Sequence, residues 1–288
     1  MHSAPLTSLG TLEAPVSRAQ SRWTELALAL GGFAIGTSEF SIMGLLPDVA
    51  REVHVTVPQA GSLISAYALG VMVGAPVLAV ACARMPRHRA LLAFLAAITL
   101  GNIASALAPT YESLLVLRFL SGLPHGTFFG VAALVVAEFA GPEARARAVG
   151  RLMLGLTIAC VVGSPLATGL GQYASWRTAY LLIGGLAALS WLLTLVHIPR
   201  MRANADASPL RELGALKKVQ VWLTLGVGSV GFGGLFAVYT YITPTLTELS
   251  GLRLALVPLV LSGVGLGMVV DNLVGAAFAD RSLSKTIV

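Results

Sequence analysis

Four ionisable side chains lie inside long apolar stretches of this 288-residue chain: Glu39, Arg118, His125 and Asp271. A charge inside a membrane span is costly, and it marks a functional site by default, with a partner or an ion path beside it. Carboxylates and imidazoles take up and release protons, and histidine does so near neutral pH. The chemistry that these residues indicate is proton transfer within a membrane.

Two of these residues are expected at similar depths. Counted from the outer ends of their stretches at 1.5 Å per residue, Glu39 and Arg118 both lie roughly 8–11 Å below the outer boundary. The sequence therefore predicts an ion pair between them, or protonation of Glu39 in alternation with Arg118. A static pair that only orders the helices is the alternative. His125 lies two turns deeper, where a buried, neutral, hydrogen-bonded histidine is the alternative to proton exchange.

The signals are weaker for Asp271 and for two tyrosines. Asp271 has three interpretations: an extra ion site, a polar residue facing a pore, or a lesion in a decaying gene. Tyr239 and Tyr241 could line a substrate cavity, and anchoring at the outer membrane interface is their alternative.

Eight apolar stretches must position these residues. Each has about 18–28 residues, enough to cross roughly 30 Å of hydrocarbon. Only helices suit such continuous stretches, because backbone polar groups in lipid must be satisfied internally. The chain is 56% hydrophobic and 11% charged, whereas soluble domains carry about 25% charged residues. The sequence predicts an all-α membrane protein with spans near 24–46, 58–83, 90–108, 113–138, 148–171, 176–198, 219–246 and 253–279.

The basic residues alternate between the gaps. Fifteen of the nineteen Lys and Arg residues precede the first stretch or follow an even-numbered one. Basic residues near span ends are retained in the cytoplasm, so both ends of the chain are predicted to be cytoplasmic. This distribution in short loops also argues against a nucleic-acid partner, despite the net charge of +6. The fifteen are Arg18, Arg22, Arg84, Arg87, Arg89, Arg145, Arg147, Arg151, Arg200, Arg202, Arg211, Lys217, Lys218, Arg281 and Lys285.

An internal repeat divides the chain. A shift of 197 positions superimposes Gly36 on Gly233, Pro47 on Pro244 and Arg84 on Arg281. We therefore expect a cytoplasmic tail (1–22), a six-helix bundle (23–198), a cytoplasmic linker (199–218) and part of a second bundle (219–288). Parallel repeats of this kind are a transporter architecture. Eight of an expected twelve spans are present, which predicts a C-terminally truncated chain lacking roughly four spans.

Local strings resemble the major facilitator superfamily. Residues 36–47 read GTSEFSIMGLLP and residues 118–130 read RFLSGLPHGTFFG. Together they resemble the drug:proton antiporter branch, especially the arabinose or sugar efflux permeases. The resemblance implies a major facilitator fold in the bacterial inner membrane, and proton-coupled export of drugs, sugars or metabolites by alternating access. A monomer is expected for the full-length form.

The resemblance also implies roles for two motifs. The family's loop motif follows the second span, with Arg84 retained but Ala83 in place of its aspartate and Pro86 in place of a glycine. The second copy keeps Asp280 and Arg281, so Arg84, Asp280 and Arg281 are candidate gating residues. In the fifth span, Gly163, Pro165 and Gly169 partly match the antiporter motif. A proline there is expected to bend the helix.

No nucleotide-binding loop, zinc-ligand spacing or catalytic triad stands out, so no enzyme activity, metal or cofactor is predicted. The expected partners are a small-molecule substrate, protons and the lipid bilayer. Two other functions stay open: a truncated membrane protein that does not transport, and a facilitator or importer of sugars.

Overall fold

The computed structural model of this chain describes residues 17–202 and 214–279, and their side chains except those of residues 18, 215, 216 and 271–279. Within these ranges the chain is helical and contains no strand. The elements are α1 (Arg18–Glu52), α2 (Val57–Cys82), α3 (Arg87–Leu107), α4 (Tyr111–Ala140), α5 (Arg145–Ile158), η1 (Ala159–Gly163), α6 (Ser164–Tyr173), α7 (Trp176–His197), η2 (Gly214–Lys217), α9 (Val219–Thr240), α10 (Ile242–Pro244), η3 (Thr245–Leu249), η4 (Leu254–Leu256) and α11 (Val257–Ala279).

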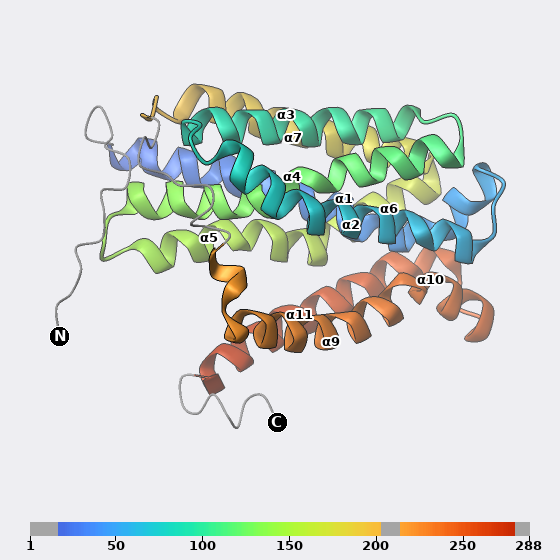
Figure 1. The fold of residues 1–288 in the computed structure, drawn as a ribbon. Helices are drawn as coiled ribbons and strands as arrows, with labels where there is room; N and C mark the ends of the chain where they lie inside the picture. Colours follow the sequence, from blue (N-terminus) through green and yellow to red (C-terminus); the bar gives the residue numbers. More distant parts are fainter. Residues whose placement is uncertain (1–16, 203–213, 280–288) are drawn as a thin grey trace.

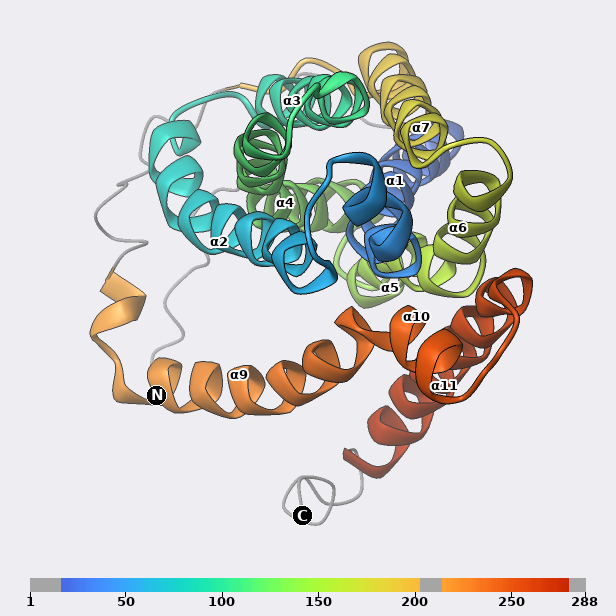
Figure 2. The same cartoon turned by 90° about the vertical axis from the view of Figure 1, so that its right-hand side faces the viewer.

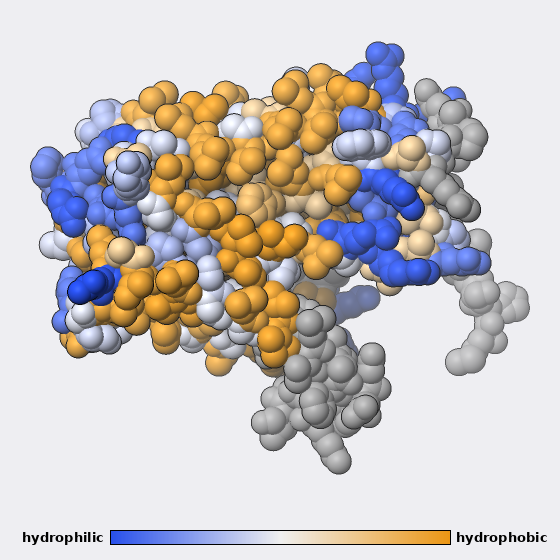
Figure 3. Space-filling view, turned by 180° about the vertical axis from the view of Figure 1, so that it is seen from behind, coloured by the Kyte–Doolittle hydropathy of each residue, from blue (hydrophilic) through white to orange (hydrophobic). Residues whose placement is uncertain are grey.

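Seven helical segments of the described chain are long and apolar enough to cross a membrane. They coincide with the first seven predicted spans. The eighth predicted span corresponds to η4 and α11, in which the apolar segment with described side chains is Leu254–Val270. Apolar side chains form a band around the middle of the molecule, with hydrophilic residues at both ends (Figure 3). The prediction of an all-α membrane protein is confirmed.

Span boundaries differ from the predictions where proline was treated as an end. α1 runs on past Pro47 to Glu52, and it begins at Arg18, inside the segment expected to be a polar tail. Ser17 caps its start by accepting a hydrogen bond from the backbone N–H of Gln20. A proline lacks a backbone N–H donor, and its ring clashes with the carbonyl four residues earlier. A long helix tolerates both effects near its end.

The helices pack as neighbouring pairs around α1. α2 lies along α4, α3 lies along α7, and α1 packs against α5 and α7 (Figure 2). The connections α2–α3 and α4–α5 and the start of α1 lie at one end of the bundle, and the connections α1–α2, α3–α4 and α6–α7 lie at the other (Figure 1). The basic loops that follow α2 and α4 therefore lie with the start of α1 at a single end, which is called the basic end below.

The 197-residue repeat is visible in the helix bounds. The offset carries Glu52, the last residue of α1, onto Leu249, the last residue of η3. It also carries α2, Val57–Cys82, onto the segment from Leu254 at the start of η4 to Ala279, the last described residue of α11. In the second copy, the part that corresponds to α1 is divided among α9, α10 and η3.

The second copy contacts the first through α10, α11 and the end of α9. α11 packs against η1 and α6, and α10 packs against α1. A Cβ added at Gly265 of α11 would lie 2.6 Å from the carbonyl oxygen of Cys160, so α11 approaches the backbone of η1 closely. In α9, Tyr239 is the one buried residue.

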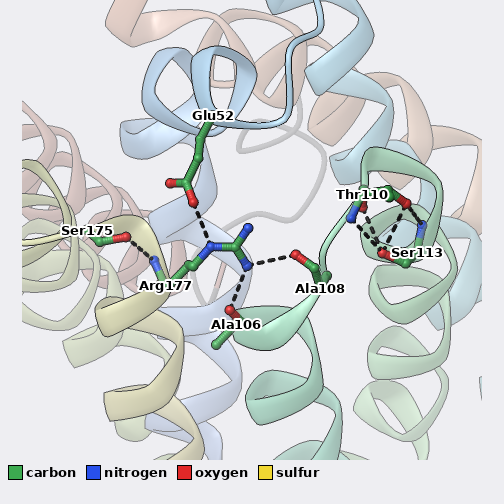
Figure 4. Close-up of polar contacts among 7 residues, drawn as sticks. All are labelled: Glu52, Ala106, Ala108, Thr110, Ser113, Ser175 and Arg177. Atoms are coloured by element: carbon green, nitrogen blue, oxygen red, sulfur yellow. Dashed lines mark hydrogen bonds and ion pairs between the residues drawn. The ribbon is translucent and has the colours of Figure 1, made fainter.

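At the end opposite the basic end, Arg177 joins three helices (Figure 4). Its Nε donates to Glu52 of α1 at 2.6 Å, and its Nη1 donates to the carbonyl oxygens of Ala106 and Ala108, each at 2.7 Å. The last carbonyls of a helix have no partner within the helix, so this side chain satisfies the end of α3. The adjacent α4 begins with Thr110 and Ser113 bonded to each other in a capping box (Figure 4).

Two apolar clusters fill the bundle, with polar residues between them. The cluster at the basic end contains residues 28–35 of α1, 90–98 of α3 and 128–136 of α4. The other cluster contains residues 40–49 of α1, Ala106 and Ala108 at the end of α3, and Leu114 of α4. Between the two lie Ser38, Asn102, Arg118 and Ser121, all buried. We call this level, together with Glu39, Tyr67 and His125, the polar layer.

Candidate functional site

The polar layer forms where α1, α2 and α4 meet. The phenol oxygen of Tyr67 on α2 lies 2.9 Å from Nδ1 of His125 on α4. The same Nδ1 lies 4.0 Å from Oε2 of Glu39 on α1. The side chains of His125 and Glu39 are 14% and 19% exposed, so both lie within the bundle but not beyond reach of water. A proton could pass between these two groups after a small displacement.

Arg118 is almost completely buried, with 1% of its surface exposed. Its guanidinium lies over the ring of Tyr67, 4.3 Å from Cζ to the ring centroid, and faces Tyr180 at 5.6 Å. Its Nη1 donates to Ser38 Oγ at 3.3 Å, whereas Nε and Nη2 have no hydrogen-bond partner. Such cation–π contacts contribute about 2 kcal/mol when desolvated, yet they satisfy no donor. The group is therefore a buried cation whose charge is only partly compensated.

A chain of hydrogen bonds holds Arg118 toward α3. Ser38 Oγ donates to Asn102 Oδ1 at 2.7 Å, and Asn102 Nδ2 donates to the carbonyl oxygen of Ile98 at 2.8 Å. The hydroxyl of Ser38 thus accepts from Arg118 and donates to Asn102, which ties α4, α1 and α3 together at one level.

The predicted pairing of Glu39 with Arg118 is not the contact that the structure shows. Neither of these two side chains makes an ion pair with the other, and Glu39 approaches His125 instead. Consecutive residues of an α-helix point about 100° apart. Ser38 therefore faces Arg118, while Glu39 faces the α2–α4 side, where His125 lies two turns further along α4.

Close backbone contact between α2 and α4 fixes this geometry. A Cβ added at Gly70 would lie 2.1 Å from the carbonyl oxygen of Phe119, and one at Gly122 would lie 2.2 Å from that of Tyr67. These glycines allow the two backbones to touch, which places Tyr67 beside both Arg118 and His125. Gly130, further along α4, faces open space.

The fifth span departs from a regular helix beside its predicted motif. The segment Ala159–Gly163 is a π-helix, and Ser164 and Pro165 follow it directly. Gly163 lies against α1, because a Cβ there would meet Thr37 Oγ1 at 2.2 Å. Gly169 has no close neighbour of this kind; Pro258 Cγ lies 3.8 Å from a Cβ built there. The irregularity thus lies N-terminal to the proline and combines with a close contact to α1.

The predicted tyrosines differ in their surroundings. Tyr239 is 4% exposed and packs edge-on against Phe40, with ring centroids 6.0 Å apart. Tyr241 is 38% exposed, and its hydroxyl lies 2.7 Å from a Cβ built at Gly61. Tyr239 therefore packs against Phe40, which directly follows Glu39, whereas Tyr241 lies over α2.

The gating candidates are only partly described. Arg84 is exposed in the turn after α2. Asp280 and Arg281 lie outside the described residues, and the side chain of Asp271 does too. The structure adds an ion pair that the motif did not suggest: Arg87 Nη1 donates to Glu138 Oε2 at 2.7 Å, which joins α3 to α4 at the basic end.

Four residues in or beside the polar layer were not identified from the sequence: Ser38, Tyr67, Asn102 and Tyr180. Each is a neutral polar residue in an apolar stretch, and such residues are frequent in membrane helices. Asn102 carried the strongest available signal, because an amide in the middle of the third span needs partners for both its donor and its acceptor.

The long membrane-spanning helices, their repeat and the buried polar layer define a polytopic membrane protein with the architecture of a solute transporter. The family model of the Major Facilitator Superfamily matches residues 28–288, and the chain belongs to this family.

Two relatives and one solved structure illustrate the similarity. The inner membrane transport protein YdhP of Escherichia coli K12 is 42% identical over 262 residues, which cover 91% of this chain and 67% of YdhP. A chloramphenicol resistance protein of Streptomyces lividans is 33% identical over 264 residues, covering 90% of this chain and 67% of that protein. The inward-facing, unoccupied structure of a bacterial homolog to the human lysosomal transporter Spinster superposes with a TM-score of 0.76 at 17% identity, over 92% of this chain and 64% of the other. The chain thus spans about two thirds of the length of the proteins that it matches.

Proposed function

We propose that the protein is a secondary active transporter that exports small molecules in exchange for protons. The observation that carries the proposal is the polar layer, where Glu39, His125 and Arg118 lie within the apolar band. Ionisable residues in such a position are proton carriers in pumps and transporters. Export is favoured by the relative named for chloramphenicol resistance and by the Gly163–Pro165 segment beside the π-helix.

The proposed mechanism is alternating access. Residues 23–198 would form one rigid bundle, residues 199–218 a cytoplasmic linker, and residues 219–288 part of a second bundle that rocks against the first. The contact of α11 with η1 and α6 supports a hinge along the fifth span. The basic end of the bundle would face the cytoplasm of a bacterial inner membrane, in keeping with the positive-inside rule.

Everted membrane vesicles that contain the protein test proton coupling. After acidification of the lumen by respiration, addition of a transported solute should release protons, read as recovery of a pH-sensitive dye. Chloramphenicol, arabinose and amino acids form the first panel. Glu39→Gln should abolish the release, because the amide cannot carry a proton. Glu143→Gln, the same change at an exposed residue between α4 and α5, should leave the release unchanged.

Three outcomes would contradict the proposal. Unchanged release in Glu39→Gln would remove this residue from the coupling. Equilibration of labelled arabinose without a pH change would identify a sugar facilitator. Absence of any solute movement across a broad panel would favour the protein that does not transport.

A further inference from the structure

The side chain of Tyr67 contacts both Arg118 and His125 of α4. Its ring covers the Arg118 guanidinium at 4.3 Å, and its hydroxyl lies 2.9 Å from His125 Nδ1. Arg118 and His125 lie seven residues apart, about two turns along the same face of α4. The ring of Tyr67 is 4% exposed, so water does not substitute for either contact.

His125 Nδ1 has two competing partners. Tyr67 Oη is within hydrogen-bond distance, and Glu39 Oε2, at 4.0 Å, is just beyond it. An imidazole nitrogen either donates or accepts, depending on where the ring proton lies. If Tyr67 donates to Nδ1, that nitrogen is unprotonated and the proton is on Nε2. An ion pair with Glu39 requires the opposite arrangement, in which Nδ1 carries a proton and donates it.

The backbone holds Tyr67 in this position. The carbonyl oxygen of Tyr67 would lie 2.2 Å from a Cβ on Gly122, so α2 and α4 are in direct contact at this residue. The charged and titratable groups that face His125 are Glu39 from α1, Tyr67 from α2 and Arg118 on α4 itself, with Tyr180 of α7 on the other side of Arg118. None of these except Tyr67 is within 3.5 Å of a ring nitrogen among the contacts of the described residues.

We propose that Tyr67 is a positioning residue that donates to His125 Nδ1, fixes the tautomer with the proton on Nε2, and keeps His125 separate from Glu39. Breaking of this hydrogen bond releases Nδ1 to take a proton and pair with Glu39. The role in coupling rests on the proposed transport function, whereas the tautomer is a property of the folded chain alone.

Nitrogen NMR of the full chain in lipid nanodiscs, with labelled histidine, tests the tautomer directly. The chain has five histidines, so the His125 signals are assigned by their loss in His125→Gln. In the unmodified chain at neutral pH, Nδ1 should give the signal of an unprotonated nitrogen that accepts a hydrogen bond. A protonated Nδ1 in the unmodified chain overturns the proposal without any variant at Tyr67.

Tyr67→Phe keeps the ring over Arg118 and removes only the hydroxyl. The ratio of the two His125 tautomers should change roughly fivefold toward protonated Nδ1, the size expected for one lost hydrogen bond. Tyr180→Phe is the matched control, because it is the same change at the other ring facing Arg118, and it should leave the His125 signals unchanged. Equal signals in Tyr67→Phe and the unmodified chain overturn the proposal.

The result is separable from that of the transport test. If vesicles show no proton exchange but the tautomer depends on Tyr67, the proposed function fails and the positioning role stands as a structural one. If proton exchange is present and Tyr67→Phe changes neither the His125 signals nor the pH at which exchange is half-maximal, the positioning role fails.

Discussion

Arg118 is the residue with the least compensated charge in the described part of the chain. It is buried between two aromatic rings, and two of its nitrogens lack a hydrogen-bond partner. Removing one partner of a buried charge leaves the full cost of burial uncompensated. The polar layer is therefore expected to respond strongly to small changes, even to the loss of one hydroxyl.

Ser38→Ala should lower the free energy of unfolding by about 1–3 kcal/mol, because it leaves both Arg118 Nη1 and Asn102 Oδ1 without a partner. Ser41→Ala provides a matched comparison on the same helix, since the Ser41 hydroxyl is buried without a partner. That variant should be neutral or slightly stabilising. In a Cys82→Ala background, thermal unfolding followed by a thiol-reactive dye, which reports exposure of the buried Cys160, measures both. Equal losses in the two variants would contradict the assigned network.

The sequence indicated Glu39, Arg118 and His125 because an ionisable residue in an apolar stretch is conspicuous. It did not indicate which of them meet. Pairing depends on the rotation of each helix, and a single residue step of about 100° sends Ser38 and Glu39 to different neighbours. Tyr67 was missed because its importance comes entirely from the residues that α4 places beside it.

At the scale of elements, the α2–α4 pair determines the geometry of the site. The two helices touch at Gly70 and Gly122, where no Cβ fits. Small residues at such contacts let membrane helices approach closely, since lipid provides little hydrophobic force to drive them together.

Gly122→Ala should therefore push α2 away from α4, with a loss of at least about 1–3 kcal/mol of stability from overpacking. Gly130→Ala, on the same helix but facing open space, should change stability by less than about 1 kcal/mol. Unfolding in a denaturing detergent titration measures both. A Gly122→Ala protein as stable as Gly130→Ala would show that the close contact is absent.

At the end of the bundle opposite the basic end, the side chain of Arg177 joins α7 to α1 and α3. Arg177→Met should cost about 1–3 kcal/mol, because the carbonyls of Ala106 and Ala108 lose their donor. Glu52→Gln should cost less than about 1 kcal/mol, since Glu52 is 43% exposed and exposed ion pairs contribute little. The same denaturation series measures both. A larger loss in Glu52→Gln would mean that the ion pair, and not the cap of α3, holds this end.

Helix positions were largely predictable from hydropathy, whereas their internal irregularities were not. The span around Pro165 was expected to bend at the proline, yet the π-helix precedes it at Ala159–Gly163. This π-helix packs against α1 and α11. Its five small apolar residues contain no sequence signal that would predict a π-helix.

The whole molecule combines an apolar band with strongly basic connections at one end. This asymmetry leads to a topological prediction that needs no substrate. In a Cys82→Ala, Cys160→Ala background, a membrane-impermeant maleimide should label Tyr173→Cys in intact cells, because Tyr173 is 92% exposed at the end opposite the basic one. Glu143→Cys, exposed near the basic end, should react only in everted vesicles or after permeabilisation. The reverse pattern would invert the proposed orientation.

The π-helix changes the helical phase of the fifth span between two contacts that this span makes with α1. One π turn holds one residue more than an α turn, so the residues after Gly163 are rotated by about 100° relative to an uninterrupted helix. Before the change of phase, Gly155 fits against the Ala29 carbonyl of α1; after it, Thr168 fits the space at Gly44 on the same helix. At the change itself, the carbonyl of Cys160 meets Gly265 of α11. Because the π turn absorbs one residue, a one-residue deletion within 159–163 would restore a regular helix and keep Thr168 facing α1, whereas a regular helix of unchanged length would turn Thr168 away.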